Sequence, residues 1–141
     1  MLVKNTKTLI LGGVRSGKSR LAERLAHETQ LSVIYIATAT IEDEEMRQRI
    51  VQHKTHRPDH WQVIEEPIKL ASVLQQYAAP SRCLLIDCLT LWLTNLLVQN
   101  NLEQFDQERQ ILLETLPSLT GRVILVSNET NLGITPLGEL S

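Results

Sequence analysis

The sequence predicts a single α/β domain built on a mainly parallel sheet with helices on both faces. Apolar runs rich in β-branched residues alternate with helical patterns along the chain, which is typical of a parallel α/β sheet. A glycine-rich motif stands between the first predicted strand and the first predicted helix. No internal repeat or linker divides the 141 residues, a length that suits one domain spanning 1–141.

The glycine-rich motif fits the pattern G-x-x-x-x-G-K-[ST] of loops that cradle phosphate groups. Glycines let successive backbone N–H groups point at phosphate oxygens, and the lysine adds a mobile positive charge. The serine hydroxyl suits Mg²⁺, and the helix that follows turns its positive end toward the phosphates. Arg15 either contacts phosphate or lies in solvent. The predicted nucleotide-binding residues of the motif are Gly12, Gly13, Val14, Arg15, Ser16, Gly17, Lys18 and Ser19.

The other elements follow from short apolar runs and helical periodicity. A strand over 8–11 precedes the motif and a helix over 20–26 follows it. A buried strand over 32–37 leads to a helix over 42–55, which is acidic early and basic late and which Pro58 blocks from continuing. A short strand over 61–64 precedes a helix over 68–77 that Pro67 starts. The remaining predictions are strands over 83–87 and 122–127 and helices over 89–98 and 102–116.

Composition excludes several classes of protein. The formal net charge of −2, without any basic run, argues against a broad nucleic-acid surface. The two cysteines, Cys83 and Cys88, lie among apolar residues and are expected to be buried free thiols, which suits a reducing compartment. We find neither a signal-peptide pattern nor an apolar run of about 18 residues. The sequence therefore predicts a cytoplasmic protein without a membrane or nucleic-acid partner.

Acidic residues follow two of the predicted strands. Asp87 closes a buried strand, which is where a phosphate-loop fold holds its Mg²⁺-organising acid. The alternative role for Asp87 is the N-cap of the helix near Leu89, and the presence of the phosphate loop favours the metal role. Glu129, beside Asn128, occupies the same place on the last strand; it either faces the ligand or lies in a surface loop.

Three histidines, His53, His56 and His60, lie close together in the sequence. Pro58 breaks the helix between the second and third, and no cysteine is near enough to complete a zinc site. Spacing alone therefore favours solvated residues at a helix end. A neutral imidazole beside a nucleotide has one further use, because it can attack an α-phosphate and form a covalent nucleotidyl intermediate.

Two other stretches leave alternatives open. The helix predicted over 89–98 is apolar on more than one face, yet it is too short and carries too many polar groups to span a membrane. It is either fully buried or part of a subunit interface. Glu65 and Glu66 precede Pro67 and, taken by themselves, are typical of acids at a helix start.

Together these motifs resemble the family of bifunctional adenosylcobinamide kinase/adenosylcobinamide-phosphate guanylyltransferase over nearly the whole chain. The phosphate loop alone is unspecific, whereas the histidine-bearing helix and the strand-end blocks together are specific. The blocks that carry the resemblance are Gly12–Ser19 with Ala22 and Glu23, Tyr35–Ala39, Asp43–Met46 with Arg49, Ile50 and His53, Arg57 and Pro58 with Trp61, Asp87–Thr90 with Thr94–Leu97, and Val126–Glu129 with Gly133, Ile134 and Pro136.

The resemblance implies two activities in cobalamin assembly and a P-loop NTPase fold of RecA-like type, assembled as a homotrimer. One activity phosphorylates adenosylcobinamide with a nucleoside triphosphate such as ATP. The other transfers GMP from GTP onto that phosphate through a histidine, and His53 stands at the matching position. It also implies Mg²⁺ as cofactor, held by Ser19 and Asp87. The implied catalytic residues are His53, Lys18, Asp87 and Glu129, and Glu65 joins the implied nucleotide-binding residues.

The chain departs from the family pattern at two places. Thr130–Leu132 stands where a Val-Gly pair usually follows Asn-Glu, and the C-terminal block with the family's last strand is absent from the sequence. We therefore expect a C-terminally short domain, either a truncated product or a fragment, that lacks the usual last strand. Two other functions remain open: another small phosphate-loop kinase without a histidine intermediate, and a catalytically silent nucleotide-binding protein.

Overall fold

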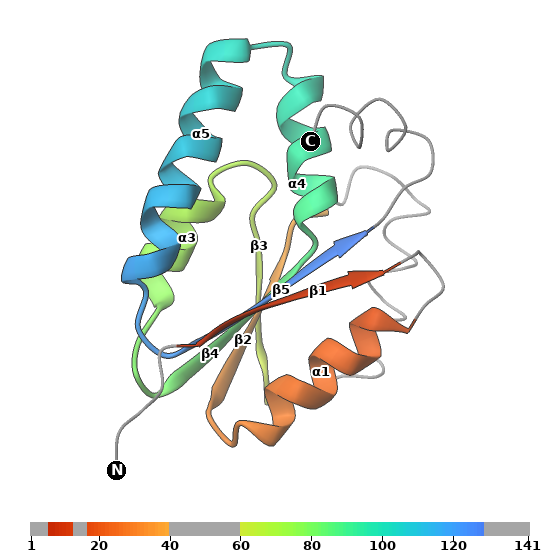
Figure 1. Ribbon diagram of the computed structural model, residues 1–141, viewed down its shortest axis with the longest axis vertical. Coiled ribbons are helices and arrows are strands. Elements are labelled where there is room, and N and C mark those ends of the chain that lie inside the picture. Colours follow the sequence, from red (N-terminus) through yellow and green to blue (C-terminus); the bar gives the residue numbers. More distant parts are fainter. Residues whose placement is uncertain (1–5, 13–16, 40–59, 129–141) are drawn as a thin grey trace.

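The computed structural model describes residues 6–12, 17–39 and 60–128, in which one sheet is covered by helices on both faces (Figure 1). The strands are β1 (Lys7–Gly12), β2 (Ser32–Ala37), β3 (Gln62–Glu65), β4 (Arg82–Asp87) and β5 (Arg122–Asn128). The helices are α1 (Lys18–Glu28), α3 (Leu70–Tyr77), α4 (Leu89–Val98) and α5 (Leu102–Thr115), with a 3₁₀ turn, η1 (Leu116–Ser118), after α5.

The sheet has five strands in the order β1-β5-β4-β2-β3, and every neighbouring pair is parallel. The prediction of a mainly parallel sheet with helices on both faces is therefore confirmed. The register places Asp87 between Ala37 and Val126, and Ala37 in turn is opposite Glu65. The carboxyl ends of the strands consequently lie along one edge of the sheet, which is where ligands bind in open α/β folds.

Each face of the sheet packs against its own helices. Alternate residues of β4 divide between the faces: Leu84 and Ile86 join the cluster under α3, α4 and α5, while Cys83 and Leu85 join the cluster under α1. Because both faces are covered, the strands read in sequence as continuous apolar runs. On α1 the small residues Ala22 and Ala26, one turn apart, are the buried contacts with the sheet.

Strand β1 lies at one edge of the described sheet and is covered on one face only. Ile10 is buried in the cluster under α1, whereas Leu9 and Leu11, which point to the opposite face, are 53% and 60% exposed. The prediction that the family's last strand is missing concerns the end of the chain. Residues 129–141 lie outside the described residues.

Two element boundaries differ from the predictions. The helix expected to start at Pro67 begins at Leu70 instead. The reason is local, because the Glu66 carboxylate accepts hydrogen bonds from the backbone N–H groups of Ile68 (3.1 Å) and Lys69 (2.9 Å) and holds this segment as a turn. The helix predicted over 102–116 ends at Thr115, where the chain tightens into η1. The helix predicted over 42–55 lies outside the described residues.

The turn into β5 requires a glycine. Gly121 has a φ of 81°, and a Cβ there would collide with the carbonyl oxygens of Ala79 and Arg82. None of the helices within 6–12, 17–39 and 60–128 is long and apolar enough to cross a membrane.

Both cysteines are buried free thiols, as predicted. Burial raises the pKa of the Cys83 thiol to about 11. This thiol therefore stays protonated in the folded protein at neutral pH, and it packs as a small apolar side chain in the cluster under α1.

Candidate nucleotide site

The two ends of the phosphate loop lie at the carboxyl edge of the sheet. Strand β1 ends at Gly12, which is paired with Asn128 of β5, and α1 begins at Lys18. Gly17 caps the helix in the left-handed region with a φ of 78°, a conformation in which glycine carries no steric penalty. The loop residues between them, Gly13 to Ser16, lie outside the described residues.

Ser19 and Asp87, the two residues predicted to hold Mg²⁺, meet in the structure. The hydroxyl of Ser19, in the first turn of α1, donates a hydrogen bond of 3.3 Å to Oδ2 of Asp87. Asp87 is the last residue of β4 and half-buried. A hydroxyl and a carboxylate side by side form an all-oxygen donor set, which is the type that Mg²⁺ prefers, so these residues fit that ion.

Asp87 is not the N-cap of the following helix. That role belongs to Cys88, whose Sγ accepts a hydrogen bond of 3.4 Å from the backbone N–H of Leu91. The Asp87 carboxylate instead accepts a second hydrogen bond at Oδ2, of 2.7 Å, from the phenol hydroxyl of Tyr35. The N-cap alternative considered for Asp87 is therefore wrong.

Tyr35 is the residue of this site that the sequence analysis did not identify. In the sequence, Tyr35 stands out only as part of a predicted strand and of a block that resembles the family. The signal that could have found it is the pairing of β2 with β4, in which Ala37 is opposite Asp87 and Tyr35 is one step back on the same face. A tyrosine in a buried strand needs a partner for its hydroxyl, and the strand-end acid is within reach.

The turn that carries Asp87 is held by the buried hydroxyl of Thr38, which is 0% exposed. Thr38 Oγ1 donates to the Cys88 carbonyl (2.7 Å) and accepts from the Cys88 N–H (2.9 Å), beside the cis peptide bond that joins Asp87 to Cys88. The Asn95 side chain then donates to the carbonyls of Thr38 (2.8 Å) and Pro67 (3.2 Å). These bonds tie the end of β2, the start of α4 and the segment before α3 together.

The end of β5 is attached to α4 in a similar way. The Thr90 hydroxyl accepts from the Asn128 N–H (2.9 Å) and lies 3.0 Å from the Asn128 carbonyl oxygen, to which it can donate. The Asn128 side-chain amide donates to the Cys88 sulfur at 3.6 Å. Asn128, one residue before Glu129 in the sequence, is thus fixed at the same edge as Asp87. Glu129 itself lies outside the described residues.

Lys18 is buried at the start of α1, with 6% of its surface exposed. Its charge is close enough to act on Cys88. Burial raises the pKa of the Cys88 thiol and the Asp87 carboxylate raises it further, while the Leu91 N–H and the Lys18 ammonium work in the opposite direction. A lysine and an aspartate that both act on one thiol belong to the same small region of the molecule.

Three further predicted site residues are His53, Glu129 and Glu65. His53 and Glu129 are outside the described residues. Glu65 ends β3 at the same level as Asp87 but with β2 between them, about 10 Å away by two strand spacings. Its side chain is exposed, and its neighbour Glu66, not Glu65, is the acid that bonds the backbone before α3.

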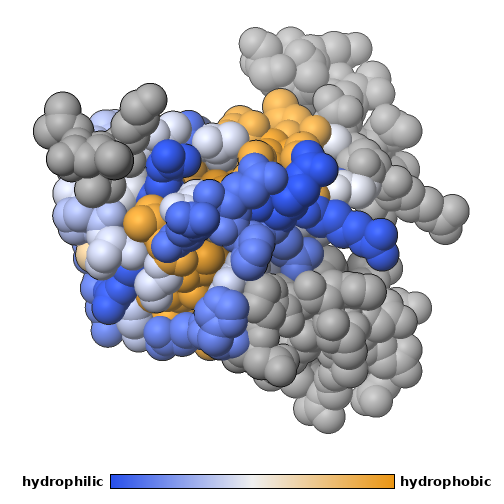
Figure 2. Space-filling view, turned by 90° about the horizontal axis from the view of Figure 1, so that it is seen from below, coloured by the Kyte–Doolittle hydropathy of each residue, from blue (hydrophilic) through white to orange (hydrophobic). Residues whose placement is uncertain are grey.

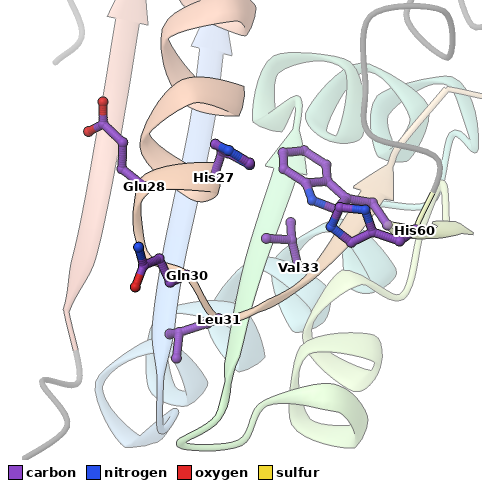
Figure 3. Close-up of a pocket in the computed structure, with 7 residues that line it drawn as sticks. His27, Glu28, Gln30, Leu31, Val33 and His60 are labelled. Atoms are coloured by element: carbon purple, nitrogen blue, oxygen red, sulfur yellow. The ribbon is translucent and has the colours of Figure 1, made fainter.

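A cavity of about 480 Å³ lies at the amino ends of the strands, opposite the carboxyl edge. It is located between the end of α1 and the starts of β2 and β3. His27 and His60 both line it, and Figure 3 shows His27 on the side of α1 toward His60 while Glu28 projects away. Seen from below, the described surface is mostly hydrophilic, with apolar side chains in separate patches (Figure 2). Within the described residues, no group of three or more His, Cys, Asp or Glu side chains is placed to hold a metal ion.

Known proteins resemble this chain over most of its length. The family model described as "Cobinamide kinase / cobinamide phosphate guanyltransferase" matches residues 8–141. The bifunctional adenosylcobalamin biosynthesis protein CobP of Pseudomonas aeruginosa is 61% identical over 135 residues, covering 96% of this chain and 78% of that protein. The bifunctional adenosylcobalamin biosynthesis proteins CobU of Salmonella typhimurium and Escherichia coli are 39% and 36% identical over 146 residues, covering 94% of this chain and 80% of each relative.

The match includes both ends of the phosphate loop, the Asp87 turn and the β5 terminus described above. It extends over most of the chain and over more than two thirds of each of these relatives. The chain therefore belongs to the cobinamide kinase/cobinamide phosphate guanyltransferase family, whose fold is that of P-loop NTPases.

Proposed function

We propose that this chain phosphorylates adenosylcobinamide with a nucleoside triphosphate and then transfers GMP from GTP onto the resulting phosphate. Membership in the family supports both activities. The single structural observation that carries the proposal is the hydrogen bond from Ser19 to Asp87 at 3.3 Å, formed where the phosphate loop meets the end of β4. This arrangement places two side-chain oxygens of the type that Mg²⁺ prefers beside the start of α1, which supports the proposal.

In the kinase reaction, the substrate hydroxyl oxygen forms a bond to the γ-phosphorus. The bond from that phosphorus to the bridging oxygen breaks, so the nucleoside diphosphate leaves and the hydroxyl loses its proton. Such transfers depend on positioning and on neutralising phosphate charge. Lys18 supplies positive charge and the N-terminus of α1 supplies backbone N–H groups. Ser19 and Asp87 would hold Mg²⁺, which when bound neutralises further charge on the phosphates.

In the nucleotidyl reaction, His53 is the proposed nucleophile. A neutral ring nitrogen forms a bond to the α-phosphorus of GTP, and pyrophosphate leaves. A phosphate oxygen of adenosylcobinamide phosphate then attacks the same phosphorus, which releases His53 and yields adenosylcobinamide-GDP. Glu129, the next residue after Asn128 in the sequence, is proposed as a further catalytic residue, because Asn128 is fixed at the carboxyl edge of the sheet. Glu65, exposed at the same edge, is proposed to contact the nucleotide.

We further propose a cytoplasmic homotrimer. The surface that supports an interface is the turn from α4 to α5, where Leu97, Val98 and Leu102 are 59%, 76% and 77% exposed. Helix α4 is thus not fully buried, which leaves the interface as the alternative for its second apolar face. Replacing Val98 with Glu should shift sedimentation toward monomer; an unchanged sedimentation coefficient would exclude this surface. The buried free thiols fit a reducing compartment.

The experiment that tests the nucleotidyl reaction is trapping of the covalent intermediate. The protein is incubated with Mg²⁺ and GTP labelled at the α-phosphate, and label on the protein is then measured. A phosphoramidate is expected, and it should be labile to acid and stable to alkali. His53→Ala should abolish the label, while His60→Ala, at the cavity on the opposite edge of the sheet, should leave it intact.

The outcomes separate the candidate functions. Folded protein that binds GTP but takes no label would contradict the guanylyltransferase proposal. Label that survives in His53→Ala would contradict the choice of nucleophile. ATP-dependent phosphorylation of adenosylcobinamide without a GMP adduct would favour a kinase alone, and nucleotide binding with neither activity would favour a silent binder.

A further inference from the structure

We infer that Tyr35 is a positioning residue of the nucleotide site, whose phenol hydroxyl orients the Asp87 carboxylate toward the cation that accompanies the nucleotide. This inference rests on the proposed function for the identity of the ligand, a nucleoside triphosphate with Mg²⁺. The observation that carries it is the hydrogen bond of 2.7 Å from the Tyr35 hydroxyl to Asp87 Oδ2.

Two hydroxyl groups share one oxygen of this carboxylate. The bond from Tyr35 is 2.7 Å and the bond from Ser19 is 3.3 Å, so Tyr35 provides the shorter contact. Hydrogen bonds to an ionised carboxylate are shorter and stronger than those between neutral groups. Because both donors use Oδ2, Oδ1 is the oxygen without a hydrogen bond from any described residue. The pair of donors therefore fixes the plane of the carboxylate and leaves Oδ1 for a cation or its bound water.

The strand register makes this contact a rigid one. Tyr35 is paired with Leu85, and the next residue on the same face, Ala37, is paired with Asp87. Ala37, which has a small side chain, belongs to the same buried cluster as Tyr35. Tyr35 itself is buried, with its ring in the cluster under α1. A buried ring with two side-chain torsions loses little further freedom when it holds a charge in place.

A purely structural role for the hydroxyl predicts a different pattern of effects. If the Tyr35 hydroxyl only satisfies buried groups, its loss lowers stability and leaves cation-dependent binding unchanged. If it orients Asp87, its loss also weakens the part of nucleotide binding that depends on Mg²⁺, and this second effect disappears when Asp87 is already altered. The Mg²⁺-dependent increment of binding therefore separates the two roles.

The test compares ATP binding by calorimetry with and without Mg²⁺ in Tyr35→Phe, Asp87→Asn and the double variant. Tyr77→Phe is the matched control, because Tyr77 lies on α3 and packs against the cluster on the other face. We expect Tyr35→Phe to reduce the gain in affinity due to Mg²⁺ by about tenfold, the effect of one hydrogen bond to a charged group. Affinity without Mg²⁺ should stay within about twofold, since the phosphate loop is unaltered. Tyr77→Phe should match the wild type.

Coupling provides the decisive comparison. The double variant should show the same Mg²⁺ increment as Asp87→Asn alone. Metal-free unfolding of the wild type, Tyr35→Phe, Asp87→Asn and the double variant should show that the two substitutions have non-additive effects on stability. Wild-type-like Mg²⁺ dependence in Tyr35→Phe would overturn the inference. So would a further tenfold loss in the Asp87→Asn background, or wild-type binding that is indifferent to Mg²⁺. A wild-type protein that binds ATP with Mg²⁺ but does not phosphorylate adenosylcobinamide contradicts the proposed function alone.

Discussion

The two faces of the sheet differ in the side chains that they bring together. On the face covered by α1, small helix residues lie on the sheet, and the polar groups of Ser19, Tyr35 and Asp87 gather at the strand ends. On the face covered by α3, α4 and α5, large apolar side chains such as Leu84 and Ile86 fill the core. We therefore expect the face covered by α1 to bind the ligand and the other face to contribute most of the stability.

The largest expected effect is on catalysis at the face covered by α1. Replacing Asp87 with Asn removes the charge that we propose holds Mg²⁺ beside the phosphates, so the rate of adenosylcobinamide phosphorylation should fall about 10²- to 10³-fold. Asp106→Asn makes the same change on α5, where Asp106 forms an exposed ion pair with Arg109, and it should leave the rate unchanged. Steady-state kinetics measure the rate of both variants. Wild-type activity in Asp87→Asn would contradict the role given to the face covered by α1.

The face covered by α3, α4 and α5 should instead respond in stability. Leu84 is fully buried in its core, so Leu84→Ala should lower the free energy of unfolding by about 2–5 kcal/mol. Leu113→Ala on α5, where the side chain is 58% exposed, should change it by less than about 0.5 kcal/mol. Urea unfolding measures both. Equal losses in the two variants would mean that this face is not the stabilising one.

A smaller effect is expected where the two regions meet, at Thr38. Thr38→Val leaves the N–H and carbonyl of Cys88 without their hydroxyl partner, which should lower the free energy of unfolding by about 1–3 kcal/mol. It should also reduce the turnover rate, because the same turn carries Asp87. The control is Thr94→Val on α4, whose exposed hydroxyl donates a hydrogen bond to the helix backbone at Thr90. A Thr38→Val protein with unaltered stability would contradict the role given to this hydroxyl.

The smallest expected effect is the pH dependence of stability from Cys83. Its thiol pKa is about 11 in the folded protein against 9.0 for an ordinary thiol. The unfolded chain therefore loses this proton first, and the stabilisation, fully present below pH 9, is lost as the pH rises toward 11. Between pH 9.5 and 10.5 the wild type should lose about 1 kcal/mol more than Cys83→Ala. Parallel pH profiles of unfolding for the two proteins would contradict the burial effect.

Much of this fold could be predicted because the local signals agree with the tertiary structure. Strand β2 and helix α4 have the predicted bounds, because each is an apolar run that ends where polar residues begin. The start of α3 could not be predicted, because the Glu66 carboxylate competes for the first backbone N–H groups. Likewise, the partner of Tyr35 depends on the register of two strands, with the bonded residues 52 positions apart. Local patterns carry no information about such register.

The most direct test of the central claim, that nucleotide and cation bind at the carboxyl edge beside α1, is paramagnetic broadening with Mn²⁺ and ATP. Mn²⁺ accepts the same oxygen ligands as Mg²⁺ and broadens the NMR signals of nearby amides. The account predicts broadening centred on Gly17, Ser19 and Asp87, with the amides of His27 and His60 at the opposite edge unaffected. Broadening centred on His27 and His60 would contradict it.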